Sequence, residues 1–509
     1  MVVKIACIAV FALITIGIGI YCGKKVKGTG DFVLGGRSVG AWFSAFAYGT
    51  SYFSAVVFVG YAGTFGWRFG ISAFWIGIAN ALLGSLMAWV VLGRRTRVMT
   101  KHLDSATMPD FFEKRYNSKA LKLASSLIIF AFLIPYSASI YKGLSGIFEM
   151  AFNIPFEYCI IAMAVLTAIY VVIGGYKAAA LNDFVQGIIM LVGIALVVWN
   201  VLANKGGFTE AIRALSEHSL EAGKVGGGIK GVFVSMFGPD PWALLGVMIL
   251  TSLGTWGLPQ MVHKFYSIKD EKAIKQGTII STIFALIVAG GSYFMGGFGR
   301  LYVENGTNGV PVTGYDGVVP AMLSNSLSDL MIGIIVVLVL SASMSTLSSL
   351  VISSSSTITL DLIKGFFWKN MSEKKQVLIM RILCAFFIVL SVVMALQPGN
   401  LISNLMAISW GALAGAFLAP FMYGLFSKKI TKSAVWVSFI VGIGIVTVNH
   451  FTGTLEGTSA GAVSMLVTLV LVPLVSLITP KLKKEHVDHC FACYDEKVET
   501  TKKKALSQG

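Results

Sequence analysis

The chain has 509 residues, of which 56% are hydrophobic and 13% are charged. This composition excludes a water-soluble protein of this length and indicates an integral membrane protein. The formal net charge of +16 comes largely from lysines and arginines that lie between apolar stretches. It therefore carries information on membrane topology and does not indicate a nucleic-acid-binding protein.

Apolar stretches of about 20 residues, the length that a helix needs to cross the hydrocarbon core, recur along the whole chain. The first lacks a small-residue cleavage site, so we expect a retained helix and not a signal peptide. The stretches predict thirteen transmembrane helices, at residues 3–22, 40–64, 70–93, 120–149, 155–175, 178–202, 241–262, 275–299, 325–360, 375–396, 398–423, 432–450 and 462–480. Residues 1–480 are thus predicted to form a single transmembrane domain.

The basic loops all fall on one side of this thirteen-helix arrangement. By the positive-inside rule that side is cytoplasmic, which predicts a multi-pass protein of the cell membrane with its N-terminus outside and its C-terminus inside. The basic groups are Lys24, Lys25 and Lys27; Arg94, Arg95 and Arg97; Lys264, Lys269 and Lys272; Lys364, Lys369, Lys374 and Lys375; and Lys428, Lys429 and Lys432.

Two predicted spans carry polar and Gly/Pro interruptions. The second contains AYGTSYFSA (47–55) and the seventh contains TSLGTWGLPQM (251–261). Irregular backbone at membrane depth is tolerated where it is buried in protein or lines a cavity, and transporters use such breaks to bind ions and substrates. The interval of five spans is expected if a five-helix unit is repeated in inverted orientation. Flexible kinks or small-residue helix contacts are the alternative.

The ninth predicted span contains an unusual number of hydroxyl groups, in SASMSTLSSLVISSSST (341–357). Buried hydroxyls and carbonyls are neutral oxygen ligands that suit a hard cation such as Na⁺. Serines that bond back to their own helix are the alternative, which we favour for residues 353–356. Four of the serines share one helix face: Ser341, Ser345, Ser348 and Ser349.

Asp183 is a second intramembrane polar group, at the start of the sixth predicted span. A carboxylate in a membrane helix requires a partner or a function. A first-turn charge that the helix dipole favours is the alternative.

The segment after the last span, residues 481–509, is predicted to be a disordered cytoplasmic tail because charged and polar residues dominate it. Two imidazoles and two thiols within HVDHCFAC (486–493) are also a candidate metal or redox site, although their spacing is too short for an ordinary zinc finger. The four residues are His486, His489, Cys490 and Cys493.

Four motifs in this order resemble the sodium:solute symporter family: LGGRSVG (34–40), YVVIGGYKAAALNDFVQG (170–187), WGLPQMVHKFYSIKD (256–270) and SASMSTLSS (341–349). The resemblance covers nearly the whole chain. It implies an all-α membrane protein with the LeuT-type fold, in which one helix precedes and two helices follow a core of two inverted five-helix repeats. The repeats would here span residues of about 40–202 and 241–423.

In that family, one sodium ion is held between the first and eighth core helices. On the matching positions, the resemblance implies a first sodium site made by the carbonyls of Thr50, Phe53 and Ala342 and the hydroxyls of Ser345 and Thr346. Some members have a second sodium site, whose matching residues here are Asp183, Ser345, Ser348 and Ser349. The chain therefore looks able to carry two sodium ions, although one or two per cycle both stay open.

The function that the resemblance implies is sodium-coupled import of a small organic solute. Thr251 and Thr255 stand where the proline transporter has a Trp and a Tyr, which argues against proline, and GLPQ (257–260) is more similar to pantothenate and monocarboxylate members. We therefore expect a carboxylate-bearing solute, such as pantothenate, a monocarboxylate or an amino acid. The candidate substrate-binding residues are Ser54, Tyr136, Thr251, Thr255, Trp256 and Pro259. Trp410 is a further candidate for lining the cavity; for Trp256 and Trp410, aromatic packing within the bundle is the alternative.

Lys142 in the fourth predicted span either pairs with the substrate carboxylate or extends to the outer surface. A proline symporter and a sodium-dependent sensor are alternative functions. The sequence contains no nucleophile with an adjacent base and no nucleotide-binding motif, so we do not expect an enzyme. The expected partners are the solute, the sodium ion and the lipid bilayer, with no nucleic acid, and no oligomeric state is indicated.

Overall fold

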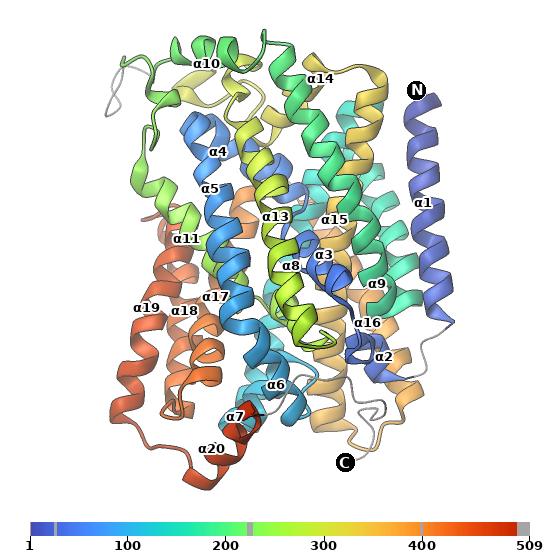
Figure 1. The fold of residues 1–509 in the computed structure, drawn as a ribbon, viewed down its shortest axis with the longest axis vertical. Coiled ribbons are helices and arrows are strands. Elements are labelled where there is room, and N and C mark those ends of the chain that lie inside the picture. The colour runs from blue at the N-terminus through green and yellow to red at the C-terminus, as the bar shows by residue number, and fades with distance from the viewer. Residues whose placement is uncertain (1, 25–27, 221–227, 398–400, 496–509) are drawn as a thin grey trace.

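Helices that run most of the length of the molecule lie side by side in a bundle (Figure 1). The computed structural model describes residues 2–24, 28–220, 228–397 and 401–495. Within these ranges the chain forms helices, turns and three isolated β-bridges, and no longer strand. The prediction of an all-helical protein is confirmed.

The first part of the chain supplies the following helices: α1 (Val2–Gly23), α2 (Thr29–Leu34), η1 (Gly35–Arg37), α3 (Ala41–Tyr52), η2 (Val56–Tyr61), α4 (Ala62–Phe69), η3 (Gly70–Ala73), α5 (Phe74–Ala79), η4 (Asn80–Met87), η5 (Trp89–Gly93), α6 (Arg94–His102), α7 (Met108–Tyr116), α8 (Lys119–Phe152) and α9 (Phe156–Ala203).

The second part supplies α10 (Phe208–Ser216), η6 (Val232–Val234), α11 (Pro241–Gly257), α12 (Pro259–Tyr266), α13 (Glu271–Gly296), η7 (Gly299–Leu301), η8 (Thr307–Gly309), η9 (Tyr315–Gly317), α14 (Val318–Ser326), α15 (Asp329–Ser356), η10 (Thr357–Phe367), α16 (Glu373–Ala395), α17 (Ile402–Phe426), α18 (Lys432–Thr452), α19 (Gly457–Ile478), α20 (Lys484–Phe491) and η11 (Ala492–Asp495).

Several of these helices begin at a side chain that accepts a hydrogen bond from the first turn. Asp240 accepts from the amide of Ala243 at 3.0 Å, and Asp270 accepts from the amide of Ala273 at 2.8 Å. Such caps satisfy amide groups that have no partner within the helix. Pro241 and Pro259 stand at first helical positions, where the missing amide hydrogen costs nothing.

Ten described helical runs are long and apolar enough to cross a membrane, or eleven with the bent pair α11–α12. The predicted count of thirteen is therefore not confirmed. The second and third predicted spans join in one run, Val56–His102, which passes through Gly70 with φ 63° and ψ −140°. In the predicted 155–175 span, the described residues form the apolar helix Phe156–Ile169, and α9 continues beyond it through the non-helical Gly175.

Both predicted interruptions are present in the backbone. The helix α3 stops at Tyr52, Phe53 is extended, and the Ser54 hydroxyl accepts a hydrogen bond from the amide of Val56 at 3.2 Å. The helices α11 and α12 meet at an angle of 45°, with Leu258 extended between them. Each break leaves backbone groups without their usual helical partners, which is what an ion or substrate site inside a membrane requires.

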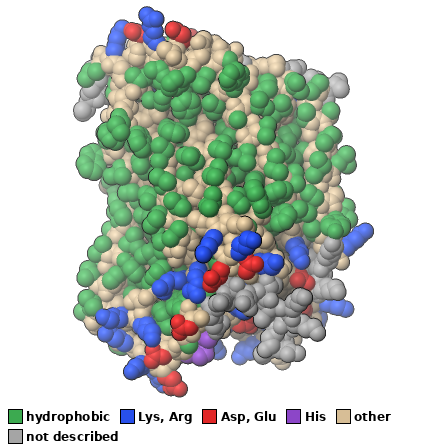
Figure 2. Space-filling view, in the orientation of Figure 1, with side chains coloured by type: hydrophobic (Ala, Val, Ile, Leu, Met, Phe, Trp, Pro, Cys, Tyr) green, Lys and Arg blue, Asp and Glu red, His purple; other side chains and the backbone are tan. Residues whose placement is uncertain are grey.

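Lys and Arg side chains gather near one end of the molecule, and the surface above them is largely hydrophobic (Figure 2). We call this the basic end; it is formed by α6, α7, α20 and the start of α8 (Figure 1), and its cations include Arg94, Arg95, Lys114 and Lys122. Lys25 and Lys27 of the predicted basic loops lie outside the described residues.

Part of the tail that was predicted to be disordered is helical. The helix α20 and the turn η11 cover residues 484–495, and the side chains of Val487 and Cys490 are buried. The Arg115 guanidinium lies 4.9 Å from the Phe491 ring centre, and Lys428 pairs with Asp488 at 2.7 Å. The prediction of disorder is wrong for this segment because contacts with Arg115 of α7 and with Lys428, between α17 and α18, hold it against the bundle. Residues 496–509 lie outside the described residues.

Candidate functional site

The five residues of the predicted first sodium site lie together where α15 passes the break after α3. The Ser345 hydroxyl lies 2.8 Å from the Thr50 carbonyl oxygen and 3.2 Å from that of Ala342. The Thr346 hydroxyl lies 3.1, 3.3 and 3.2 Å from the carbonyl oxygens of Thr50, Phe53 and Ala342. All five residues are buried.

The break is what makes the α3 carbonyls available. The amide of Val57 donates to the Ser54 carbonyl at 3.0 Å, so it does not pair with the carbonyl of Phe53 as it would in a continuous α-helix. The Phe53 oxygen therefore points to Thr346 on the neighbouring helix. The hydroxyl groups on one face of α15 and the carbonyl groups at the break in α3 therefore form one cluster of oxygens.

This cluster fits a hard monovalent cation. Five neutral oxygens face one another, yet the two hydroxyls supply only two protons among three carbonyls. A hydroxyl can turn its proton away and offer a lone pair, so an ion could be held by all five oxygens. Carbonyl and hydroxyl oxygens suit Na⁺ far better than Zn²⁺ or Cu²⁺.

The residues of the predicted second sodium site are only partly brought together. Asp183 is fully buried in α9, and its two oxygens have no hydrogen-bond partner among the described residues. The Ser348 hydroxyl bonds back to the Ser345 carbonyl at 2.8 Å, whereas the Ser349 hydroxyl lies 2.8 Å from the ammonium nitrogen of Lys264. That nitrogen is 3.6 Å from Asp183 Oδ2, so a lysine lies among the predicted ligands.

Most of the predicted substrate residues on α11 and α12 already use their polar side-chain groups in hydrogen bonds to backbone carbonyls. The Thr251 hydroxyl donates to the Val247 carbonyl at 2.8 Å, and the Thr255 hydroxyl donates to that of Gly84 at 3.0 Å. The Trp256 indole donates to the Leu83 carbonyl at 2.9 Å. Pro259 begins α12, and the Ser54 hydroxyl accepts from the amide of Val56 just before η2, so these two residues shape the breaks.

A cluster of buried aromatic residues, which we call the aromatic cluster, lies beside the α3 break. The Trp410 ring lies 5.7 Å from the Tyr52 ring and 5.8 Å from the Tyr136 ring, measured between centres. The hydroxyl of Tyr136 and the indole nitrogen of Trp410 are buried with no hydrogen-bond partner within the described ranges. Such groups are costly unless a ligand or water satisfies them, so the cluster is a candidate substrate site.

The cavities differ in size between the middle and the ends of the bundle. The deep cavity beside Tyr52 and Asn80 has a volume of about 10 Å³, which is too small for an organic solute. A cavity of about 580 Å³ is lined by Lys142, Glu149 and Asp316. The Lys142 ammonium donates to the Gln397 carbonyl at 2.7 Å there, away from the aromatic cluster. The geometry agrees with the interpretation that Lys142 extends to a surface.

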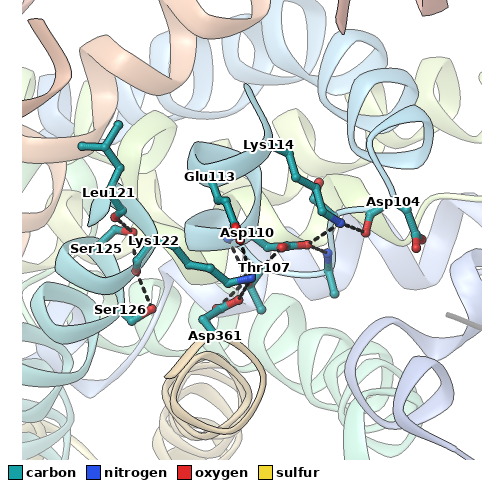
Figure 3. A network of polar contacts seen from close by, with 12 residues as sticks. Asp104, Thr107, Asp110, Glu113, Lys114, Leu121, Lys122, Ser125, Ser126 and Asp361 are labelled. Atoms are coloured by element: carbon teal, nitrogen blue, oxygen red, sulfur yellow. Dashed lines mark hydrogen bonds and ion pairs between the residues drawn. The ribbon is translucent and has the colours of Figure 1, made fainter. Parts of the chain in front are cut away.

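A cavity of about 620 Å³ opens at the basic end beside an ion-pair network (Figure 3). The Lys122 ammonium lies 2.8 Å from both Asp110 and Glu113 and 3.6 Å from Asp361. Thr107 donates to Asp361 at 2.6 Å. Because these residues come from α7, α8 and η10, one ammonium links three helical segments around the cavity.

Asp110 lies outside the predicted spans, and its ionisation is set by this network. Burial alone would raise the pKa of its carboxyl group, but the ammonium groups of Lys122 and Lys114 outweigh that effect. The pKa of Asp110 is therefore below its ordinary value, and the carboxylate form is favoured in the folded protein.

Only two of the four candidate metal residues of the tail approach each other: the Cys490 sulfur lies 3.6 Å from His486 Nε2. The His489 ring lies beside the His102 ring, with 4.9 Å between the centres of the tilted rings, and His486 also approaches the Arg115 carbonyl at 3.3 Å. Among the described residues, which include all four candidates, no group of three or more His, Cys, Asp or Glu side chains is placed to hold a metal ion. The expectation of a metal site here is not supported, because α20 turns the imidazoles toward α6 and α7.

Comparison with known proteins gives consistent results. A model of the sodium:solute symporter family matches residues 32–442. The osmoregulated proline transporter OpuE of Bacillus subtilis is 28% identical over 476 residues, which cover 92% of this chain and 93% of the relative. A sodium/proline symporter of Escherichia coli is 28% identical over 442 residues, with coverage of 86% and 85%.

One solved structure, of a Na⁺-coupled sialic acid symporter, covers 94% of this chain and 98% of its own. The TM-score is 0.76 at 17% sequence identity, which shows that the two chains share a fold.

Proposed function

Because the chain belongs to the sodium:solute symporter family, with sodium as its coupling ion, we propose that it imports a small carboxylate-bearing solute, and that proline is the first solute to test. The observation that carries the proposal is the oxygen cluster between α3 and α15. Its hydroxyls, on Ser345 and Thr346, contact three carbonyls that the helix break makes accessible.

We assign the sodium ion to this cluster. The ion would lie next to Ser54 and the aromatic cluster, because Phe53 and Tyr52 belong to the same break. An ion that rigidifies the break would also fix the substrate-facing residues that follow it, so solute and sodium would favour each other's binding. This coupling is the physical requirement for symport.

The solute is assigned to the aromatic cluster. Two relatives named as proline transporters support proline as the solute. Thr251 and Thr255 argue against it, because they reduce the aromatic surface that α11 can offer to a proline ring. A compact carboxylate could receive hydrogen bonds from the Tyr136 hydroxyl and the Trp410 indole. Other short carboxylates and pantothenate remain alternatives to proline.

We further propose that the basic end faces the cytoplasm, that the N-terminus lies outside, and that residues 40–202 and 241–423 form inverted repeats. The positive-inside rule supports the orientation, because the cations of α6 and α7 and most of the predicted basic loops lie at one end. The helix breaks at Phe53 and Leu258 support the repeats, because they occupy corresponding places in the two units.

Tyr136→Phe tests the solute assignment. We expect the KM for the solute to rise about tenfold or more, because a hydrogen bond to a charged group contributes about 1.5–3 kcal/mol. The measurement is sodium-driven uptake into proteoliposomes, with proline, pantothenate and short monocarboxylates as competitors. The exposed Tyr158 provides a control, and Tyr158→Phe should leave the KM unchanged. Competition by uncharged sugars but by no carboxylate would contradict the assignment.

A further inference from the structure

Lys264, which the charge pattern of the sequence places in a basic loop, lies inside the helical bundle. It lies in the last turn of α12, beyond the break at Leu258, and its side chain is 2% exposed. The error arises because the break shortens the apolar stretch and makes the residues after it resemble a basic loop. A buried lysine inside a membrane bundle requires a partner and indicates a function.

The ammonium group of Lys264 takes a position that a second cation would need. It donates to the Ser349 hydroxyl at 2.8 Å and lies 3.6 Å from Asp183 Oδ2. The Tyr176 ring centre lies 5.2 Å away, and the Ser51 and Ser349 hydroxyls are 2.8 Å apart. Asp183 and Ser349 are both predicted ligands of the second sodium site.

The backbone around Lys264 is held in place by the segment LGGRSVG (34–40). The Arg37 guanidinium donates to the carbonyls of Tyr266, Thr100 and Ser105 at 3.1, 3.2 and 2.7 Å. The amide of Val39 donates to the Ser267 carbonyl at 3.1 Å. The end of α12 is therefore fixed by the LGGRSVG segment, and the lysine projects inward from a fixed base.

The described surroundings of Asp183 already hold one cation. The pocket lined by Tyr176, Lys264 and Ser349 has no room for a water-sized molecule beside the ammonium group. A single carboxylate, Asp183, is already compensated by one ammonium, and a sodium ion placed beside that ammonium would meet a like charge in a low-dielectric interior.

We propose that Lys264 is a tethered cation that fills the Asp183–Ser349 position, so that this protein moves one sodium ion with each solute. The inference rests on the proposed function, because it concerns the stoichiometry of the same transport cycle. It makes Lys264 a specificity-determining residue, since its side chain decides how many ions the fold accepts. One charge moved through 100 mV supports about 50-fold accumulation of a neutral solute.

The experiment measures ²²Na⁺ and solute fluxes in the same proteoliposomes, with native protein and Lys264→Met. We expect a flux ratio and a sodium Hill coefficient of about 1 in the native protein. In Lys264→Met, the uncompensated Asp183 should accept sodium, so both values should rise toward about 2. Lys264→Arg, which keeps the cation, and the double variant Asp183→Asn with Lys264→Met should both stay near the native value.

Two sodium ions per solute in the native protein would overturn the inference, even if Lys264→Met failed to fold. A folded Lys264→Met protein with an unchanged ratio and Hill coefficient would also overturn it. Solute flux in the native protein that needs no sodium would refute the proposed function itself, and the inference with it.

Discussion

Thr346→Ala is expected to raise the sodium concentration for half-maximal uptake by about 10- to 150-fold. The Thr346 hydroxyl contacts three carbonyl oxygens from both sides of the candidate ion position. Loss of one ligand to a charged group should cost about 1.5–3 kcal/mol, at about 1.4 kcal/mol per tenfold change. The measurement is solute uptake into proteoliposomes as a function of sodium concentration, at constant ionic strength.

Two further variants make this test specific. Thr346→Ser keeps the hydroxyl and should retain most of the sodium affinity. Ser356→Ala removes a hydroxyl that bonds to the Ser353 carbonyl of its own helix at 3.2 Å, and it should change nothing. A sodium dependence that is the same in Thr346→Ala and in the native protein would place the ion elsewhere.

Lys122→Met is expected to lower the free energy of unfolding by about 3–5 kcal/mol, because it leaves Asp361 buried without the Lys122 cation and leaves Asp110 with Lys114 alone, at 3.0 Å. The Asp361 side chain is only 2% exposed, and that of Asp110 is 13% exposed. The measurement is the thermal midpoint of the purified protein. Lys119→Met, at the exposed start of the same helix, is the control and should have a much smaller effect. Equal midpoints in native and Lys122→Met protein would show that the network contributes little.

The pH dependence of stability follows from Asp110. Its pKa is lower in the folded than in the unfolded protein, so the contribution is fully present above the ordinary carboxyl pKa of about 4. It is lost as the pH falls through the lower, folded value. We therefore expect the difference between native and Lys122→Met protein to be largest near neutral pH and to shrink in acid. A difference that grew on acidification would contradict this account.

The first candidate sodium site could be predicted because its signals are local. The break in AYGTSYFSA and the serine periodicity of α15 each lie within one short segment, and the family resemblance places the two segments together. The structure brings the oxygens of Thr50, Phe53 and Thr346 within hydrogen-bond distance.

The aromatic cluster could be predicted only in part. Tyr136 and Trp410 are candidates from the sequence, but the three rings meet from α3, α8 and α17, which lie far apart in the sequence. No local pattern brings such residues together. Tyr52 was not a candidate, although it lies within the interrupted segment 47–55, which is the signal that could have identified it.

The count of thirteen spans stays a prediction, because hydropathy windows and helix lengths divide the chain differently at the turn at Gly70 and the break at Phe53. The same windows placed Lys264 in a loop although its side chain is buried. The tail helix α20 is held by contacts with Arg115 and Lys428. Because these partners lie elsewhere in the chain, the composition of the tail alone does not predict the helix.

The measurement that tests the central claim most directly is proline uptake by the native protein in proteoliposomes, with an inward sodium gradient or an equal choline gradient. The account predicts that proline accumulates above equilibrium only with sodium, and that ²²Na⁺ enters at a rate that depends on proline. Accumulation of a carboxylate-bearing competitor in place of proline would change the solute and leave the mechanism intact. Uptake of every tested solute at the same rate in sodium and choline would contradict the account.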